Sequence, residues 1–201
     1  VLFGFSLAYD LAADEGDKAL IARDVAALVG QILTDDLRII DVDGKVTRWG
    51  RYFPKYVKYE ALNALLWLQA LKVAEHVTGE PRFSEAYRKY AVDEGYAEIS
   101  VKARRMLNPL TPGAVNHSDD VLFFLGHEPL LRYETDPALR ERYLEGFRRA
   151  WNGVDRFPGL KAEGNPLYAW LAAKYVSDDS GVAAALATLR WFPLDMKMNL
   201  A

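Results

Sequence analysis

The sequence predicts an all-α protein made of helical hairpins, and three observations carry this prediction. Four stretches repeat one pattern, in which an apolar helix, a short polar turn and a second helix follow one another. The first helix of each pair is apolar on nearly every side, whereas the second is amphipathic, as expected for an inner and an outer layer. The links between the pairs are long, while the turns inside them are short.

Two concentric layers of helices are the arrangement of an α/α toroid, or of an arc of one with about four hairpins. The alternative is an α-solenoid, which also stacks helix pairs. Solenoid repeats are more regular in length than these four stretches, so the toroid is favoured. A four-hairpin arc would expose apolar helix faces at its two open edges, which predicts self-association or further chain segments that close the ring.

The elements follow in order along the chain. The predicted hairpins span residues 7–29, 68–92, 130–151 and 170–192. Helices buried on all sides are predicted within residues 61–74, 121–126 and 167–176. The polar turns supply N-cap candidates for the second helices, namely Asp17, Ser84 or an earlier turn residue, Thr135 or Asp136, and Asp179 or Ser180. Pro137 suits a first helical turn, where its missing N–H costs no hydrogen bond.

The long links occupy roughly residues 36–56, 105–117 and 152–165, and each leads into a buried helix. If the hairpins run side by side, all of these links lie at one pole, where long ordered loops of a rigid scaffold usually carry function. The amino ends of the buried helices have free backbone N–H groups and positive dipole ends. We therefore expect this pole to favour anionic groups such as carboxylates and sulfates.

Composition excludes several classes of function. The net charge is −3, the pI is about 5.7 and basic runs are absent, which argues against a nucleic-acid partner. The absence of cysteine excludes disulfides, thiolate zinc sites and cysteine nucleophiles but leaves the compartment open, with a secreted or periplasmic location among the options. Nucleotide-binding, α/β-hydrolase and zincin motifs are missing, so no cofactor or metal is predicted.

The ends of the sequence predict a fragment of a longer chain, with residues 1–201 forming one toroid-like domain. The sequence begins without Met inside an apolar pattern and stops without a closing element. The opening does not resemble a signal peptide, because no basic residue precedes it and Asp10 interrupts it. It is also too short to span a membrane.

The stretch "DVDGKVTRWGRYFP", residues 41–54, is the most unusual link. Asp41 and Asp43 could supply a carboxylate for acid/base work on a sugar bond. The alternative is a turn, because Asp before Gly commonly bonds its own backbone, and this alternative is favoured. The run "LRIIDVDG", residues 37–44, alternates weakly and predicts a short strand before the Asp–Gly turn.

The aromatic and basic residues of the same stretch predict a ligand surface. Arg48 and Arg51 could hold a carboxylate in bidentate fashion, and Trp49 or Tyr52 could stack on a sugar face. Alternatively, Trp49 packs the loop against the rim of the toroid, while Arg48 forms an ion pair with Asp41 or Asp43. Asn63, in the first turn of the following helix, either extends this cleft or only packs there.

The run "NHSDD", residues 116–120, is the second polar cluster and precedes another buried helix. His117 could act as a general base, or bind a metal with Asp119 or Asp120. Alternatively, Asn116 or Ser118 caps the helix and the acidic residues complement its dipole. Farther along, Asn165 before Pro166 is predicted to cap a third buried helix and to lie at the same pole.

Two further histidines give weaker indications of a functional site. His127 and Glu128 precede Pro129, which should kink their helix and could turn polar groups toward a central cavity. A satisfied core histidine is the favoured alternative. His76, close to a turn, is predicted to lie at the surface.

These features resemble known proteins at two levels. The architecture is similar to that of α/α-toroid proteins, among them six-hairpin glycosidases and toroid polysaccharide lyases. More locally, the loop patterns D-x-D-G-x-x-T-R-W-G and N-x-S-D-D resemble those of uncharacterised bacterial proteins, over most of the chain. The first resemblance implies carbohydrate chemistry, and the second brings no established activity.

We therefore carry two hypotheses from the sequence. The first is a carbohydrate-active toroid, a hydrolase or lyase acting on an oligosaccharide, and the expected anion-favouring pole suits an acidic one. Its predicted acid/base residues are Asp43, Asp119 and His117, and its predicted substrate-binding residues are Arg48, Trp49, Arg51, Tyr52, Asn116, Asp120 and Asn165. The second hypothesis is a non-enzymatic binding or scaffolding module.

Overall fold

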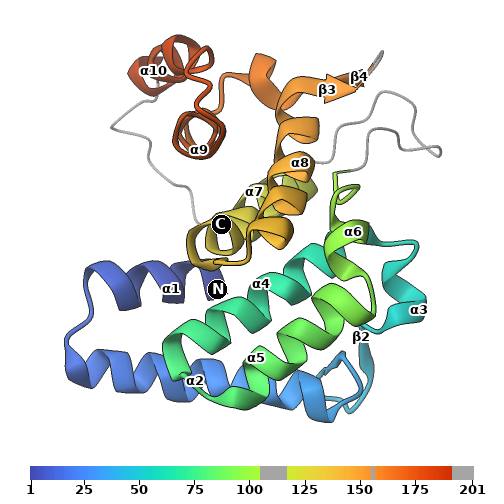
Figure 1. Cartoon of the computed structure of the whole chain (residues 1–201). Helices are drawn as coiled ribbons and strands as arrows, with labels where there is room; N and C mark the ends of the chain where they lie inside the picture. The colour runs from blue at the N-terminus through green and yellow to red at the C-terminus, as the bar shows by residue number, and fades with distance from the viewer. Residues whose placement is uncertain (105–116, 155–156, 192–201) are drawn as a thin grey trace. The chain divides into compact units, whose positions relative to one another are not determined.

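A computed structural model describes residues 1–104, 117–154 and 157–191 (Figure 1). Within these ranges the chain is mostly helical, which confirms the all-α class. It divides into two compact units, Val1–Phe147 and Arg148–Ala201, which are described separately. None of the described helices is both long enough and apolar enough to cross a membrane.

Each of the four predicted hairpins corresponds to two consecutive helices. Their helices are α1 (Leu2–Leu11) with α2 (Glu15–Thr34), α4 (Ala61–Thr78) with α5 (Pro81–Arg88), α7 (His117–Tyr133) with α8 (Pro137–Asn152), and α9 (Pro166–Val176) with α10 (Val182–Trp191). Shorter helical elements are α3 (Pro54–Val57), the π-helix η1 (Lys89–Asp93), α6 (Tyr96–Ser100) and the 3₁₀ helix η2 (Leu160–Glu163). The strands are β1 (Arg38–Ile40), β2 (Val46–Arg51), β3 (Gly153–Val154) and β4 (Phe157–Pro158).

Helix α4 is the core of the first unit. It contacts α1, α2, α5, α6 and α7, and in Figure 1 it runs beside α5. Most of its side chains are buried on all sides, including Trp67, Leu68 and Leu71, which confirms the prediction from its apolar sequence. The same prediction is less accurate for the other inner helices, because Leu122 of α7 and Trp170 of α9 are exposed.

Two of the second helices, α2 and α8, begin at a side-chain N-cap, whereas α5 does not. Asp14, not Asp17, caps α2, since its side chain accepts a hydrogen bond from the Asp17 N–H at 2.9 Å. Asp136 caps α8 as predicted, accepting from the N–H of Ala138 at 2.8 Å. Helix α5 begins after Glu80, with Pro81 in its first turn, so Ser84 lies inside the helix.

The link at residues 36–56 is not a plain loop. The predicted strand β1 pairs antiparallel with β2, and the Asp–Gly turn connects them. The second strand was not predicted from the sequence, which placed these residues in an irregular link. The resulting hairpin leads through α3 into the amino end of α4.

The second unit contains the end of α8, the β3–β4 ribbon, η2 and the α9–α10 hairpin. The indole N–H of Trp151 donates to Asp178 Oδ2 at 2.9 Å, and Lys161 Nζ lies 3.1 Å from the same oxygen. A Cβ at Gly181 would lie 2.7 Å from the Trp151 ring, so only glycine lets the ring pack there. The Trp151–Asp178 contact thus links the end of α8 to the turn before α10.

Candidate functional site

Residues 47–50, Thr-Arg-Trp-Gly, form a bulge in the β1–β2 hairpin. Arg38 pairs with Arg51 and Ile40 pairs with Val46, so one residue of β1 faces four residues of β2. The extra residues leave the ladder and project from it, as in other large β-bulges, which are common beside functional sites. We call residues 47–50 the TRWG bulge.

The TRWG bulge is held in one shape by its own residues. The backbone N–H of Gly50 donates to Thr47 Oγ1 at 3.1 Å, and Arg51 Nε donates to the Thr47 carbonyl at 3.3 Å. A Cβ at Gly50 would lie 2.5 Å from Thr47 Oγ1 and 2.7 Å from the Cβ of Ile39. No larger residue fits there without displacing the strand, so the sequence needs glycine at this position.

Arg48 and Trp49 are presented outward by this bulge. The indole of Trp49 is 67% exposed, and the guanidinium of Arg48 lies 4.6 Å from its ring centroid. A cation over a tryptophan face holds the ring in a defined orientation. The Trp49 ring therefore forms an exposed apolar surface, with the positive charge of Arg48 beside it.

The bulge is anchored to the helical core. Asn63, in the first turn of α4, donates from Nδ2 to the carbonyls of Trp49 at 2.7 Å and Arg51 at 2.9 Å. Tyr52 turns inward, stacking on buried Trp67 at 5.5 Å, and its carbonyl accepts from the Tyr96 hydroxyl. Of the predicted binding residues in this hairpin, Arg48 and Trp49 therefore face solvent, whereas Tyr52 is half-buried and its ring packs against the core.

Asp41 and Asp43 have turn partners. The Gly44 N–H donates to the Asp41 carbonyl at 2.9 Å, and Gly44 has a φ of +76°, which suits glycine. Asp43 accepts from the Lys45 N–H at 3.0 Å and pairs with Lys45 Nζ at 2.7 Å. The side-chain bond from Lys45 lowers the pKa of Asp43 below its ordinary value. Asp43 is thus ionised at neutral pH, which suits a base or nucleophile rather than a general acid.

The second polar cluster begins α7. His117 is exposed, Asp119 is half-buried and Asp120 is buried, where it pairs with Arg104 Nε at 3.0 Å. Two acidic residues in a first turn complement the helix dipole, as the capping alternative expects. Asn116 lies outside the described residues. The pairing of Asp120 with Arg104 gives this carboxylate a structural partner, and Asp119 and His117 remain the more accessible members.

Asn165 caps α9 as predicted, with Oδ1 accepting from the backbone N–H of Leu167 at 3.0 Å and of Tyr168 at 3.4 Å. It lies in the second unit, and its role in ligand binding stays a prediction. Pro166 follows at the first helical position.

His127 is a core histidine. It is fully buried, its Nδ1 lies 3.0 Å from the Phe123 carbonyl, and its ring packs 4.1 Å from that of Phe123. Burial disfavours the charged ring and lowers the pKa of His127 to about 4. The burial agrees with the interpretation favoured from the sequence, but Nε2 has no hydrogen-bond partner among the described residues, so the ring is satisfied only in part.

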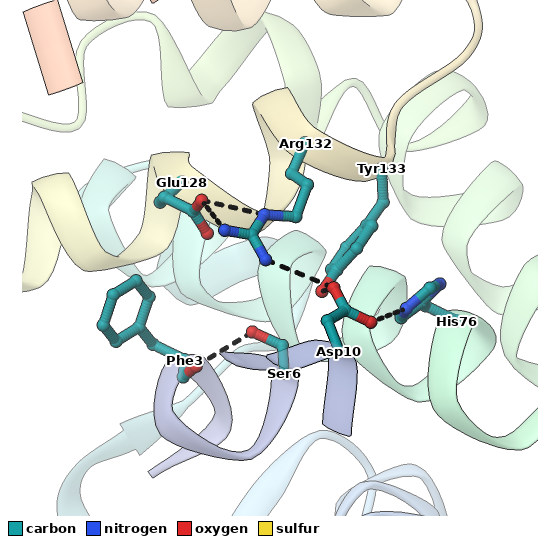
Figure 2. A network of polar contacts seen from close by, with 7 residues as sticks. All are labelled: Phe3, Ser6, Asp10, His76, Glu128, Arg132 and Tyr133. Carbon is teal, nitrogen blue, oxygen red and sulfur yellow. Dashed lines mark hydrogen bonds and ion pairs between the residues drawn. The ribbon is translucent and has the colours of Figure 1, made fainter. Parts of the chain in front are cut away.

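A charged cluster that the sequence did not reveal joins the carboxyl-terminal ends of three helices. Figure 2 shows Asp10 of α1 surrounded by His76 of α4 and by Arg132 and Tyr133 of α7. His76 Nε2 and the Tyr133 hydroxyl each lie 2.7 Å from an Asp10 oxygen, and Arg132 Nη1 lies 3.2 Å away. Arg132 also pairs with buried Glu128 at 2.8 Å.

The Asp10 cluster has a clear structural role. Carboxylates are unfavourable at a helix carboxyl terminus, where the dipole is negative, and the polar contacts with His76 of α4 and with Arg132 and Tyr133 of α7 offset that cost. Burial raises the pKa of Asp10, but the bonds from His76, Tyr133 and Arg132 outweigh it, so the pKa lies below its ordinary value. The rings of His76 and Tyr133 stack at 3.9 Å, which fixes the imidazole. The cluster clamps α1 onto α4 and α7.

A second buried cluster centres on Glu134. Its carboxylate accepts from the Tyr87 hydroxyl and from the Asp136 N–H, and it lies 3.5 Å from Lys72 Nζ. Lys72 is only 7% exposed and also lies over the Tyr87 ring. A lysine inside the apolar helix 61–74 was the one sequence signal for such a partner, because buried charges are paired.

Comparison with known proteins found no similarity that would identify the chain. No protein-family model matches it, and neither the curated proteins nor the solved structures include a significant match.

Proposed function

We propose that this chain is a saccharide-binding helical protein of the α/α-toroid type, and that the TRWG bulge contacts the sugar. One observation carries the proposal: Trp49 is exposed on a bulge whose shape is locked by Thr47 and Gly50 and anchored by Asn63. A large indole held open to solvent loses little conformational entropy when a sugar ring stacks on it. The adjacent Arg48 suits a ligand that carries carboxylate or sulfate groups.

Replacing Trp49 with alanine should abolish most of this binding. We expect the affinity for an oligosaccharide selected on a glycan array to fall on the order of tenfold or more, since aromatic anchors dominate binding. Calorimetric titration of both proteins measures the change. The control is Trp170→Ala, which also removes an exposed indole, here 51% exposed, under a lysine 5.1 Å from its centroid. Equal losses in both variants would refute a specific role of the bulge.

The same proposal extends to catalysis by hydrolysis or elimination at the bound saccharide. Asp43, ionised at neutral pH, suits the role of base or nucleophile, and Asp119 or His117 would supply the second group. If the chain degrades an oligosaccharide, Asp43→Asn or Asp119→Asn should lower kcat by on the order of a hundredfold or more while the affinity changes little. A time course of reducing-end release measures this. Unchanged turnover in both variants removes these residues from the reaction.

The alternative function is a non-enzymatic association module. It is favoured by apolar side chains exposed on the first hairpin, Leu11, Leu20 and Leu28, and by a hollow of about 270 Å³ between α1 and α2. Such a module would self-associate with rising concentration and bind no saccharide. The titration with oligosaccharides therefore separates the two functions.

A further inference from the structure

A second hollow of the first unit lies where α3 leads into α4. Its volume is about 460 Å³, and it is lined by Lys58, Tyr59 and Ala61 on one side and by Glu98, Lys102 and Glu145 on the other. The Tyr59 side chain is 81% exposed. The hollow is open to solvent and combines an aromatic ring with charged groups, as saccharide and other polar-ligand sites do.

The charges of this hollow favour an anion. Arg142 lies 2.7 Å from Glu145 and 3.8 Å from Glu98, so it offsets the two acidic groups in part. Lys58 and Lys102, by contrast, form no ion pair with any residue that the structure describes. Ala61 begins α4, whose amino end adds a positive dipole on the same side. The two ammonium groups are therefore available to a ligand.

The hollow lies close to the TRWG bulge along the chain. Asn63 contacts the Trp49 carbonyl at 2.7 Å, and Ala61 is only two residues before Asn63. Standard chain dimensions then place the Trp49 carbonyl and the Ala61 Cα within roughly 12 Å of each other. A short oligosaccharide spans that distance.

We infer that this hollow is an anion subsite, in which Lys58 and Lys102 bind a carboxylate or sulfate of an acidic oligosaccharide whose neighbouring ring stacks on Trp49. This inference rests on the proposed saccharide binding and specifies its ligand class. The lysines supply ionic contacts, Tyr59 supplies a face for the sugar ring, and Glu98 disfavours a second anion. Neutral oligosaccharides have no anionic group for the lysines to bind, so the lysines do not raise their affinity.

The test compares three tetrasaccharides in calorimetric titrations: a tetragalacturonate, a heparin-derived tetrasaccharide and neutral maltotetraose. The double variant Lys58→Ala/Lys102→Ala should lose on the order of tenfold in affinity for an acidic ligand and leave any neutral binding unchanged. The carboxylate and sulfate ligands show which anion the hollow prefers. The control is Lys55→Ala/Lys89→Ala, which removes the same charge from exposed positions outside the hollow. All four lysines are exposed, so the variants should fold.

The outcomes distinguish the two proposals. A selective loss for acidic ligands in the hollow variant, absent from the control, supports the anion subsite. Equal affinities in the hollow variant and the control overturn the subsite, while a loss in Trp49→Ala still supports binding at the bulge. If wild-type protein binds neither these ligands nor any glycan on the array, the proposed function fails and the subsite fails with it.

Discussion

Replacing Glu134 with leucine should lower the free energy of unfolding by about 3 kcal/mol or more, because breaking a buried charged network strands its partners. The substitution leaves the Asp136 N–H without its acceptor and the Tyr87 hydroxyl with only the Tyr143 hydroxyl, 2.6 Å away. It also leaves Lys72 with Glu75 alone. Glu75, 3.0 Å from Lys72 Nζ, is about one-third exposed, so it compensates only in part. Urea denaturation monitored by circular dichroism measures the loss.

The matched control is Glu85→Leu, which makes the same change at an exposed position of α5 and should alter stability by no more than about 0.5 kcal/mol. The double variant Lys72→Met/Glu134→Leu should recover part of the loss, since it removes the stranded ammonium as well. If Glu134→Leu lowers the free energy of unfolding no more than Glu85→Leu does, the claim that this network stabilises the fold is contradicted.

His127 should make the protein less stable in weak acid. The pKa of His127 is about 4 in the folded state, because burial disfavours the charged ring, and about 6.5 in the unfolded chain. Between these values the unfolded chain binds a proton that the folded protein does not. Stability is therefore complete above about pH 6.5 and falls by about 3 kcal/mol as the pH drops to 4.

Urea denaturation at several pH values between 4 and 7 measures this slope in the wild type and in His127→Gln. The variant should be less stable at pH 7, where it loses packing against Phe123, but its stability should change less across this window. Carboxylates with lowered pKa values, such as Asp10, destabilise the fold only at lower pH, so they do not mask the effect. If stability changes equally with pH in the two proteins, His127 is not the source of the pH dependence.

The hairpin pattern could be predicted from the sequence because it depends on local periodicity and capping. Asp136 and Asn165 cap their helices where the sequence placed them, since an N-cap needs only a side-chain oxygen near its own backbone. Apolar residues on every side of the stretch 61–74 were sufficient to predict its burial in α4. The arrangement of the hairpins as a toroid stays a prediction.

For the candidate site, the sequence indicated which residues take part but not how they are arranged. Arg48 and Trp49 were predicted to contact a ligand, and this stays a prediction; the bulge that presents them depends on strand register, which a sequence of this kind does not specify. The same register turns the Tyr52 ring toward Trp67, which the sequence did not indicate, and a role of Tyr52 in ligand contact stays a prediction.

The charged clusters could not be predicted because they depend on tertiary contacts. His76 is exposed, as predicted, but its contact with Asp10, 66 residues away in the sequence, forms only because the ends of three helices meet. Nothing in the local sequence around either residue signals the other. Only Lys72, a charge inside an apolar helix, indicated that a buried partner must exist.

The most direct test of saccharide binding at the TRWG bulge is the indole N–H region of a ¹H–¹⁵N NMR spectrum during titration with the tetragalacturonate. The chain has five tryptophans, and Trp49→Phe assigns the resonance of Trp49. Binding at the bulge predicts that this resonance shifts progressively while those of buried Trp67 and Trp151 stay in place. A spectrum in which the Trp49 signal stays fixed at saturating ligand would contradict the proposed function.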